Sequence, residues 1–218
     1  MGTRHLVAVH IDGEYKVGQY GQWDGYPSGQ GVALLDFLRS GNIEGLKRNL
    51  ARTFEPNEDD EKRMWAEFGV DIVATNGSVP YEVARAHGER YPSLSRDTGA
   101  EILQLIADWA SEERIPLVAD ISFAGDSLFC EWAYVIDFDI GTFEVYRGFN
   151  KEGPVPEGSR FHDIPWDDNR LHGIGPYYQV TLSRSWNLED LPSQEAFLDA
   201  FKAPAKAEDT SSVPATAE

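Results

Sequence analysis

The residues best suited to chemistry lie between Tyr20 and Gly31, in the stretch YGQWDGYPSGQG. Its four glycines permit backbone conformations that bulkier residues resist. Its side chains offer stacking surfaces, amides, a carboxylate and a hydroxyl. These side chains belong to Tyr20, Gln22, Trp23, Asp24, Tyr26, Ser28 and Gln30. A helix is predicted to follow, and its first backbone N–H groups would face the same loop. The combination predicts a pocket for a small polar or anionic ligand.

Two residues of the neighbouring predicted strand, Arg4 and His5, are expected to complete this pocket. Arg4 would hold an anionic group of the ligand. Trp23 and Tyr26 would stack on a ring, and Asp24 or His5 would move a proton. The stretch is neither a P-loop nor a dinucleotide fingerprint, because GK[ST] and the GxGxxG spacing are absent. The alternative interpretation is a tight loop whose aromatic side chains pack into the hydrophobic core.

Cys130 is the only cysteine of the chain. It could act as a nucleophile with a histidine as its base, but a lone cysteine in an apolar strand is typical of a core residue. A single cysteine also excludes an intrachain disulfide and favours a reducing compartment.

Three patterns bear on metal binding. A loop rich in nitrogen and oxygen ligands could hold a divalent cation, although such loops are usually only solvated. It contains His162, Asp163, Asp167, Asp168 and His172. Asp137 and Asp139 share one face near the end of a predicted strand, which would suit paired carboxylates, but a strand end entering a turn explains them equally well. His5 and His10 fall on opposite faces of their strand, so they cannot chelate one metal there. The sequence therefore predicts no metal site.

The elements that must position these residues indicate an α+β fold. Apolar residues at helical spacing alternate with β-rich runs bounded by turn residues. The predicted strands are 6–11, 15–20, 117–121, 128–139, 142–148 and 177–186, and the predicted helices are 32–40, 42–54, 57–69, 80–88, 97–113 and 193–201. We expect one mixed or largely antiparallel sheet, or two stacked sheets, packed with helices. Residues 1–201 are predicted to form a single globular domain, followed by a disordered tail at 202–218.

Charge and hydropathy limit the partners. The chain has a formal net charge of −18 over 218 residues, which repels phosphate backbones and anionic lipids. Direct nucleic-acid or membrane binding is therefore not expected, whereas a basic protein or a cation would be attracted. The sequence has neither an apolar run long enough to span a membrane nor a secretory signal, and it predicts a cytoplasmic protein.

Four segments, MGTRHL, GEYKVGQYGQWDGYPSGQG, EWAYVIDFD and TFEVYRG, resemble a family of uncharacterised proteins from bacteriophages and, with variations, from fungi. The resemblance spans residues 1 to about 200, and the second segment is quite specific. It implies a phage-type origin and an N-terminus that belongs to the shared pattern. It implies no activity.

A strand at the extreme N-terminus preceded by Thr3 is also similar to the N-terminal nucleophile hydrolases, which have two sheets sandwiched between helices. Such an enzyme needs its nucleophile as the first residue, so that the free α-amine can act as base. Removal of Met1 would expose Gly2, and Thr3 would need a second cleavage. The likeness therefore bears on architecture more than on activity.

Two functions from different classes follow. In the first, the Tyr20–Gly31 loop binds or hydrolyses a small polar metabolite, with Thr3, His5 and Asp24 as candidate catalytic residues and no particular cofactor indicated. In the second, an acidic, aromatic-rich surface docks on a basic host protein and inhibits or redirects it, imitating the charge of nucleic acid.

Overall fold

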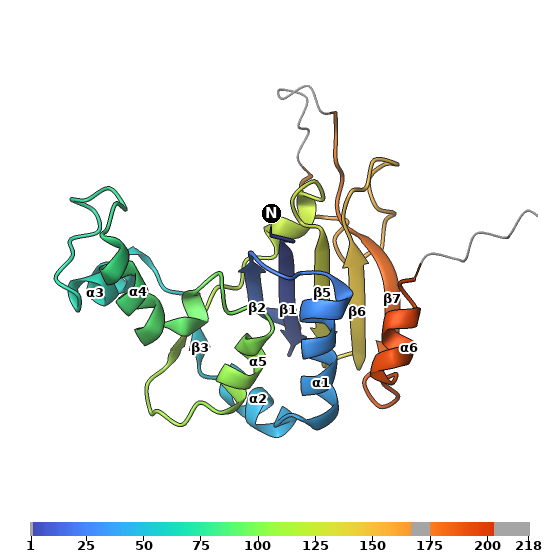
Figure 1. Ribbon diagram of the computed structural model, residues 1–218, viewed down its shortest axis with the longest axis horizontal. Helices are drawn as coiled ribbons and strands as arrows, with labels where there is room; N and C mark the ends of the chain where they lie inside the picture. The colour runs from blue at the N-terminus through green and yellow to red at the C-terminus, as the bar shows by residue number, and fades with distance from the viewer. Residues whose placement is uncertain (1, 167–174, 203–218) are drawn as a thin grey trace, which may run out of the picture.

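A single mixed sheet organises the molecule. The computed structural model describes residues 2–166 and 175–202. Five strands lie in the order β2-β1-β5-β6-β7, as Figure 1 shows. They are β1 (His5–Ile11), β2 (Glu14–Gly21), β5 (Trp132–Asp137), β6 (Thr142–Arg147) and β7 (Thr181–Asn187). β1 and β5 are parallel, and the other neighbouring pairs are antiparallel. The predicted α+β class is confirmed.

One face of the sheet is covered by four helices. They are α1 (Val32–Ser40), α2 (Ile43–Leu50), α5 (Glu101–Ala107) and α6 (Gln194–Asp199). Because side chains alternate across a strand, Val7, Val9, Tyr134 and Ile136 all point to this face. They share one core with apolar residues of the helices, and α1, α5 and α6 stand before the sheet in Figure 1.

The opposite face carries a thinner layer without α-helices in the described ranges. Leu6, Ala8, Ala133 and Val135 point to it and pack with Phe161 from the loop after β6. The short 3-10 helix η3 (Ser122–Gly125) completes this layer. The second sheet of the described chain consists only of the two-residue strands β3 (Thr53–Phe54) and β4 (Ile115–Pro116). The two-sheet sandwich of N-terminal nucleophile hydrolases therefore does not form there.

Cys130 lies on the other face from the one predicted. The two-residue period along the predicted strand 128–139 puts Cys130 on the same face as Tyr134, but Cys130 belongs to the core that includes Ala133 and Val135. The reason is that β5 begins only at Trp132. A turn precedes it, in which the amides of Phe129 and Cys130 both donate to the Asp126 carbonyl. The two-residue period cannot be extended through a turn.

Two helices, α3 (Glu58–Ala66) and α4 (Tyr81–Arg90), form an arm beside the sheet, on the left of Figure 1. Asn57, a residue type that favours the N-terminal cap of a helix, begins the predicted helix 57–69, and its side chain accepts from the amides of Asp59 and Asp60. The predicted strand 117–121 is reduced to an isolated bridge between Ala119 and Gly18. No described helix has the length and apolar character needed to cross a membrane. The predicted tail from 203 onward lies outside the described residues.

The contact between α2 and α5 depends on Asn49, which is 2% exposed. Its Nδ2 donates to the carbonyls of Ile106, at 2.8 Å, and Trp109, at 3.2 Å, at the C-terminal end of α5. We expect Asn49→Ala to lower the free energy of unfolding by about 1–3 kcal/mol, because these carbonyls lose their donor. Urea denaturation measures the change. Arg48→Ala, on the exposed side of the same helix, should change it by less than about 0.5 kcal/mol.

Candidate functional site

The Tyr20–Gly31 loop connects β2 to a π-helical turn, η1 (Pro27–Gly31), that runs directly into α1. Two of its backbone N–H groups are used within the loop. The amide of Gly29 donates to the Tyr26 carbonyl and that of Gln30 to the Asp24 carbonyl, each at 2.9 Å. The prediction of free N–H groups facing a ligand is therefore wrong at these positions, because the chain enters the helix through an extra hydrogen-bonded turn.

The polar side chains of the loop bind one another and the segment 96–100. Tyr20 donates to Gln22 Oε1 at 2.6 Å, and Tyr26 donates to Asp24 Oδ1 at 3.0 Å. The Trp23 indole donates to Asp97 at 2.9 Å. Gln30 accepts from the Ala100 amide at 2.7 Å and donates to the Trp23 carbonyl. These bonds fix the loop in place.

The remaining predicted site residues do not converge on this loop as a group. Thr3 contributes its carbonyl, which accepts from the Gly25 amide at 2.9 Å. Arg4 instead places its guanidinium over the Phe129 ring, 4.8 Å from the centroid. Ser28 is exposed, as are Trp23, at 49%, and Tyr26, at 41%. The loop is thus a well-ordered surface element with exposed aromatic side chains.

His5 is enclosed beneath the loop and is 1% exposed. A Cβ added to Gly21 would lie 2.1 Å from its ring, so only glycine fits there. Neither ring nitrogen makes a hydrogen bond of good geometry to a described residue. Burial lowers the pKa of His5 to about 4, against weaker opposing effects of the Thr3 carbonyl and Asp24. The ring is neutral at physiological pH and shielded from solvent, which does not suit a proton donor to a bound ligand.

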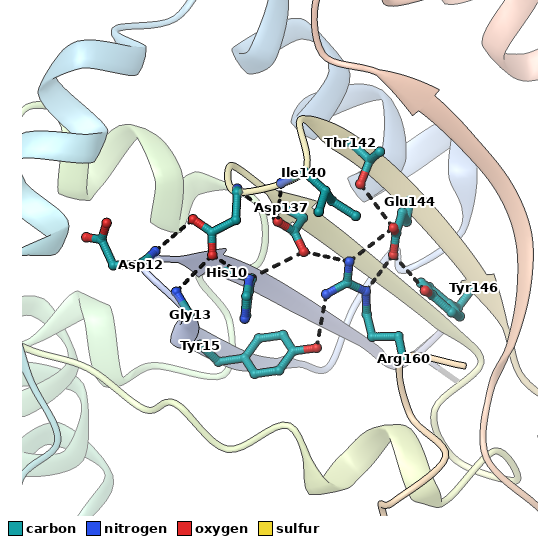
Figure 2. A network of polar contacts seen from close by, with 11 residues as sticks. His10, Asp12, Gly13, Tyr15, Asp137, Ile140, Thr142, Glu144, Tyr146 and Arg160 are labelled. Carbon is teal, nitrogen blue, oxygen red and sulfur yellow. Dashed lines mark hydrogen bonds and ion pairs between the residues drawn. The ribbon is translucent and has the colours of Figure 1, made fainter. Parts of the chain in front are cut away.

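A different cluster gathers around Arg160, which lies in the loop between β6 and β7 (Figure 2). Its Nε and Nη2 donate to Glu144 on β6, at 2.6 and 3.1 Å. Nη2 also donates to Asp137 Oδ2 at the end of β5, at 2.7 Å, and Nη1 donates to the Tyr15 hydroxyl, at 3.3 Å. Tyr146 donates to Glu144 Oε2 at 2.6 Å. Arg160 therefore joins strands β2, β5 and β6 on the face without α-helices.

The Arg160 cluster holds its charges fixed. Burial alone would raise the pKa of Asp137 and of Glu144, but hydrogen bonds and the charge of Arg160 lower both below their usual values. Burial would lower the pKa of Arg160, and its bonds to Glu144, Tyr15 and Asp137 raise it instead. Burial and Glu144 raise the pKa of Tyr146. At neutral pH both carboxylates stay ionised and the phenol stays protonated.

A cavity of about 860 Å³ opens beside this cluster, and we call it the Arg160 cavity. Its polar lining includes His10, Tyr15, Glu144, Tyr146 and Arg160, and its apolar lining includes Ile140, Val155, Phe161, Val180 and Leu182. It combines one charged, fixed wall with an apolar one, a common design of ligand sites.

Next to the cavity, the His10 ring stands between two carboxylates. Its Nδ1 lies 3.2 Å from Asp139 Oδ2 and 3.4 Å from Asp137 Oδ2. Tyr15 holds the ring in an edge-to-face contact with centroids 4.9 Å apart. The amides of Asp12 and Gly13 bind the Asp139 carboxylate at 2.9 and 2.8 Å. His10 and the paired aspartates are thus brought together.

Sequence reasoning missed Arg160, Tyr15, Glu144 and Tyr146. One available signal was Glu144 itself, a carboxylate inside the apolar strand TFEVYR, because a buried carboxylate needs a cationic partner. The nucleophile alternative for Cys130 loses support, since the thiol is fully buried and burial raises its pKa. In the loop that was considered as a metal site and not predicted to be one, His162 Nδ1 lies 2.9 Å from the Val155 carbonyl, whereas Asp167, Asp168 and His172 lie outside the described residues.

Comparisons of this chain with protein-family models, with curated proteins and with solved structures give no match. The functional argument therefore depends on the geometry of the described residues.

The buried His5 makes stability depend on pH. The unfolded chain takes up a proton near pH 6.5, whereas folded His5 does so only near 4. Stability is therefore full above pH 6.5 and falls between 6.5 and 4, by up to about 3 kcal/mol from this residue. An NMR titration of the His5 ring protons should give a midpoint close to 4. A midpoint above 6 would show that the ring is solvated.

The loss of the Arg160 side chain is expected to destabilise the fold strongly. Arg160→Met leaves Asp137 and Glu144 buried without a cation, which should reduce the free energy of unfolding by about 3–5 kcal/mol. Adding Asp137→Asn and Glu144→Gln to the same chain should restore at least half of that loss. Thermal and urea unfolding measure both. Equal destabilisation by the single and triple variants would mean that charge pairing is not the cause.

Proposed function

We propose that this protein binds a small amphipathic molecule, neutral or cationic, in the Arg160 cavity. The observation that carries this proposal is the juxtaposition of a fixed polar wall, made by Arg160 and its partners, with an apolar wall in one opening of about 860 Å³. This keeps the ligand-binding function expected from the sequence and moves it from the Tyr20–Gly31 loop to the other face of the sheet.

Binding is favoured over hydrolysis because the carboxylate that lines the cavity already accepts hydrogen bonds from neighbouring side chains. Both oxygens of Glu144 accept two hydrogen bonds each, from Arg160, Thr142 and Tyr146. A carboxylate held ionised in this way is a poor general acid, and one saturated with donors is a poor base. The fixed charges instead make a preorganised wall, which lowers the cost of binding.

The charge of the wall selects the ligand class. Glu144 in the wall and Asp137 and Asp139 beside it carry three negative charges against the single positive charge of Arg160, in a chain of net charge −18. A multiply anionic ligand would be repelled. Arg160 has five N–H groups, and no described residue accepts the fifth, on Nη1. One acceptor atom on the ligand can take this N–H while its hydrocarbon part covers Val155 and Leu182.

The acidic interaction surface remains a second proposal because of helix α3. Its side chains Glu58 and Asp59, which both lie near Lys62, are 92% and 90% exposed, and α3 belongs to the arm beside the sheet. Such charges attract a basic partner protein. Capture of one basic protein that is lost as salt rises, and lost with Glu58→Lys and Asp59→Lys, would favour this function over the cavity.

The cavity proposal is tested by screening a library of small neutral and cationic compounds for a rise in melting temperature. A ligand present at about 100 times its Kd stabilises the fold by about 2.7 kcal/mol. Leu182→Trp, which places an indole at the cavity mouth, should abolish the shift. Val73→Trp is the matched control. Val73 is 63% exposed and Leu182 is 56% exposed, but Val73 lies on the arm.

The same compounds are then followed by NMR. Binding in the cavity should shift signals of Tyr15 and Leu182 and leave the indole N–H of Trp23 unchanged. Hits that shift Trp23, and that bind Leu182→Trp as tightly as the original chain, would return the site to the Tyr20–Gly31 loop. A library without any hit that depends on Leu182 would contradict the proposal.

A further inference from the structure

We propose that His10, Asp137 and Asp139 form a binding site for one divalent transition-metal ion at the edge of the Arg160 cavity. The three residues come from β1, the end of β5 and the turn that follows β5. One ligand atom from each lies within 4.8 Å of the others. The site stands independently of the small molecule proposed above.

The distances fit a shared ion better than they fit two hydrogen bonds. His10 Nδ1 is 3.2 and 3.4 Å from the two carboxylate oxygens. Ligand atoms bound at about 2.0–2.2 Å to one tetrahedral or octahedral ion are separated by roughly 2.9–3.5 Å. Nδ1 is also enclosed from solvent, and it makes no hydrogen bond of good geometry to either oxygen or to another described residue. A ring nitrogen that is enclosed, has two anionic neighbours and makes no hydrogen bond of its own is available to bind a cation.

The charge of the surroundings points the same way. Near His10, the three carboxylates of Asp137, Asp139 and Glu144 face the one positive charge of Arg160, which leaves these four groups a net charge of −2. Asp139 is 33% exposed and His10 is 20% exposed, but the other two carboxylates are buried. Asp137 is 3% exposed and Glu144 is 9% exposed. A divalent ion neutralises this excess, which is otherwise costly to bury.

The ligands are also held in place by hydrogen bonds. Two of these go to the proposed ligand oxygens, since Gly13 N donates to Asp139 Oδ2 and Arg160 Nη2 donates to Asp137 Oδ2, and each oxygen keeps a further lone pair for the ion. The amides of Asp139 and Ile140 bind Asp137 Oδ1 at 2.9 and 3.1 Å. The amides of Asp12 and Gly13 bind the Asp139 carboxylate, and Tyr15 fixes the plane of the His10 ring. Outer contacts of this kind orient metal ligands and are part of what gives metal sites their affinity.

One imidazole nitrogen and two carboxylate oxygens suit first-row ions such as Mn²⁺ or Zn²⁺. Because His10 also lines the Arg160 cavity, the positions of the ion that the protein does not fill would face that cavity. The ion would connect the β1–β2 turn to the β5–β6 turn through Asp139, and it should therefore stabilise the fold when bound.

The test uses MnCl₂ and ZnCl₂ separately on the full chain at physiological ionic strength, where loose binding to acidic surfaces is screened. Isothermal titration calorimetry should show one saturable site. The NMR signals of the Asp12, Gly13 and Ile140 amides should broaden first as paramagnetic Mn²⁺ is added, and ZnCl₂ should restore them.

His10→Phe keeps a ring against Tyr15 and removes the nitrogen ligand, so it should weaken Mn²⁺ binding at least about tenfold. His87→Phe is the matched control, because His87 stacks on Trp65 in the arm with centroids 3.9 Å apart, far from the site. It should bind Mn²⁺ as the original chain does.

No saturable binding, or binding equally strong in His10→Phe, would overturn the proposal. So would broadening that begins on the acidic helix α3 instead of at the two turns. If His10→Phe fails to fold, the broadening pattern of the original chain decides the question without it.

Discussion

The pairing of Arg160 with two buried carboxylates is the interaction on which the thin face of the sheet depends. Helices cover the other face with a continuous apolar core, but here a loop must be held against β2, β5 and β6. Arg160 does this with bonds to Tyr15, Asp137 and Glu144. Because a guanidinium has donors in a fixed planar fork, it sets the positions of its partners as well as their charge.

This constraint explains why the candidate site lies on that face. A layer of apolar helices fills the space beside the strands. The loop that carries Arg160 is hydrogen-bonded to the strands through that side chain, which leaves a cavity next to it. The same Asp137 that binds Arg160 also faces His10, so the ion cluster and the proposed metal site share one carboxylate. Fixing Arg160 therefore fixes one wall of the cavity and one ligand of the metal site together.

The sequence was informative wherever a feature is local. The Asp12-Gly13 turn, the Asn57 cap and the helix ending before Gly41 each depend on residues close in the chain, and their elements are found where predicted. The Tyr20–Gly31 stretch, which the sequence predicts to be a ligand pocket, forms a closely packed loop. Its glycines allow close packing, since a Cβ on Gly21 or Gly25 would meet His5, and its polar side chains satisfy one another.

The rest depended on contacts between distant residues. Arg160 is 23 positions from Asp137 and 145 from Tyr15, and no spacing rule connects them. Asp137 and Asp139 were recognised as a pair, but His10 joins them only because β1 and β5 are parallel neighbours, with His10 opposite Asp137. Parity along β1 correctly separated His10 from His5, yet it could not reveal the partner on the adjacent strand.

The most direct test of this account is the NMR signal of the Arg160 Nε–H group at neutral pH. The account predicts a resolved proton that exchanges slowly with water and shows a hydrogen-bond coupling to the Glu144 carboxylate. A fast-exchanging signal at the position of a free arginine would contradict it, because the loop would then not be tied to the sheet.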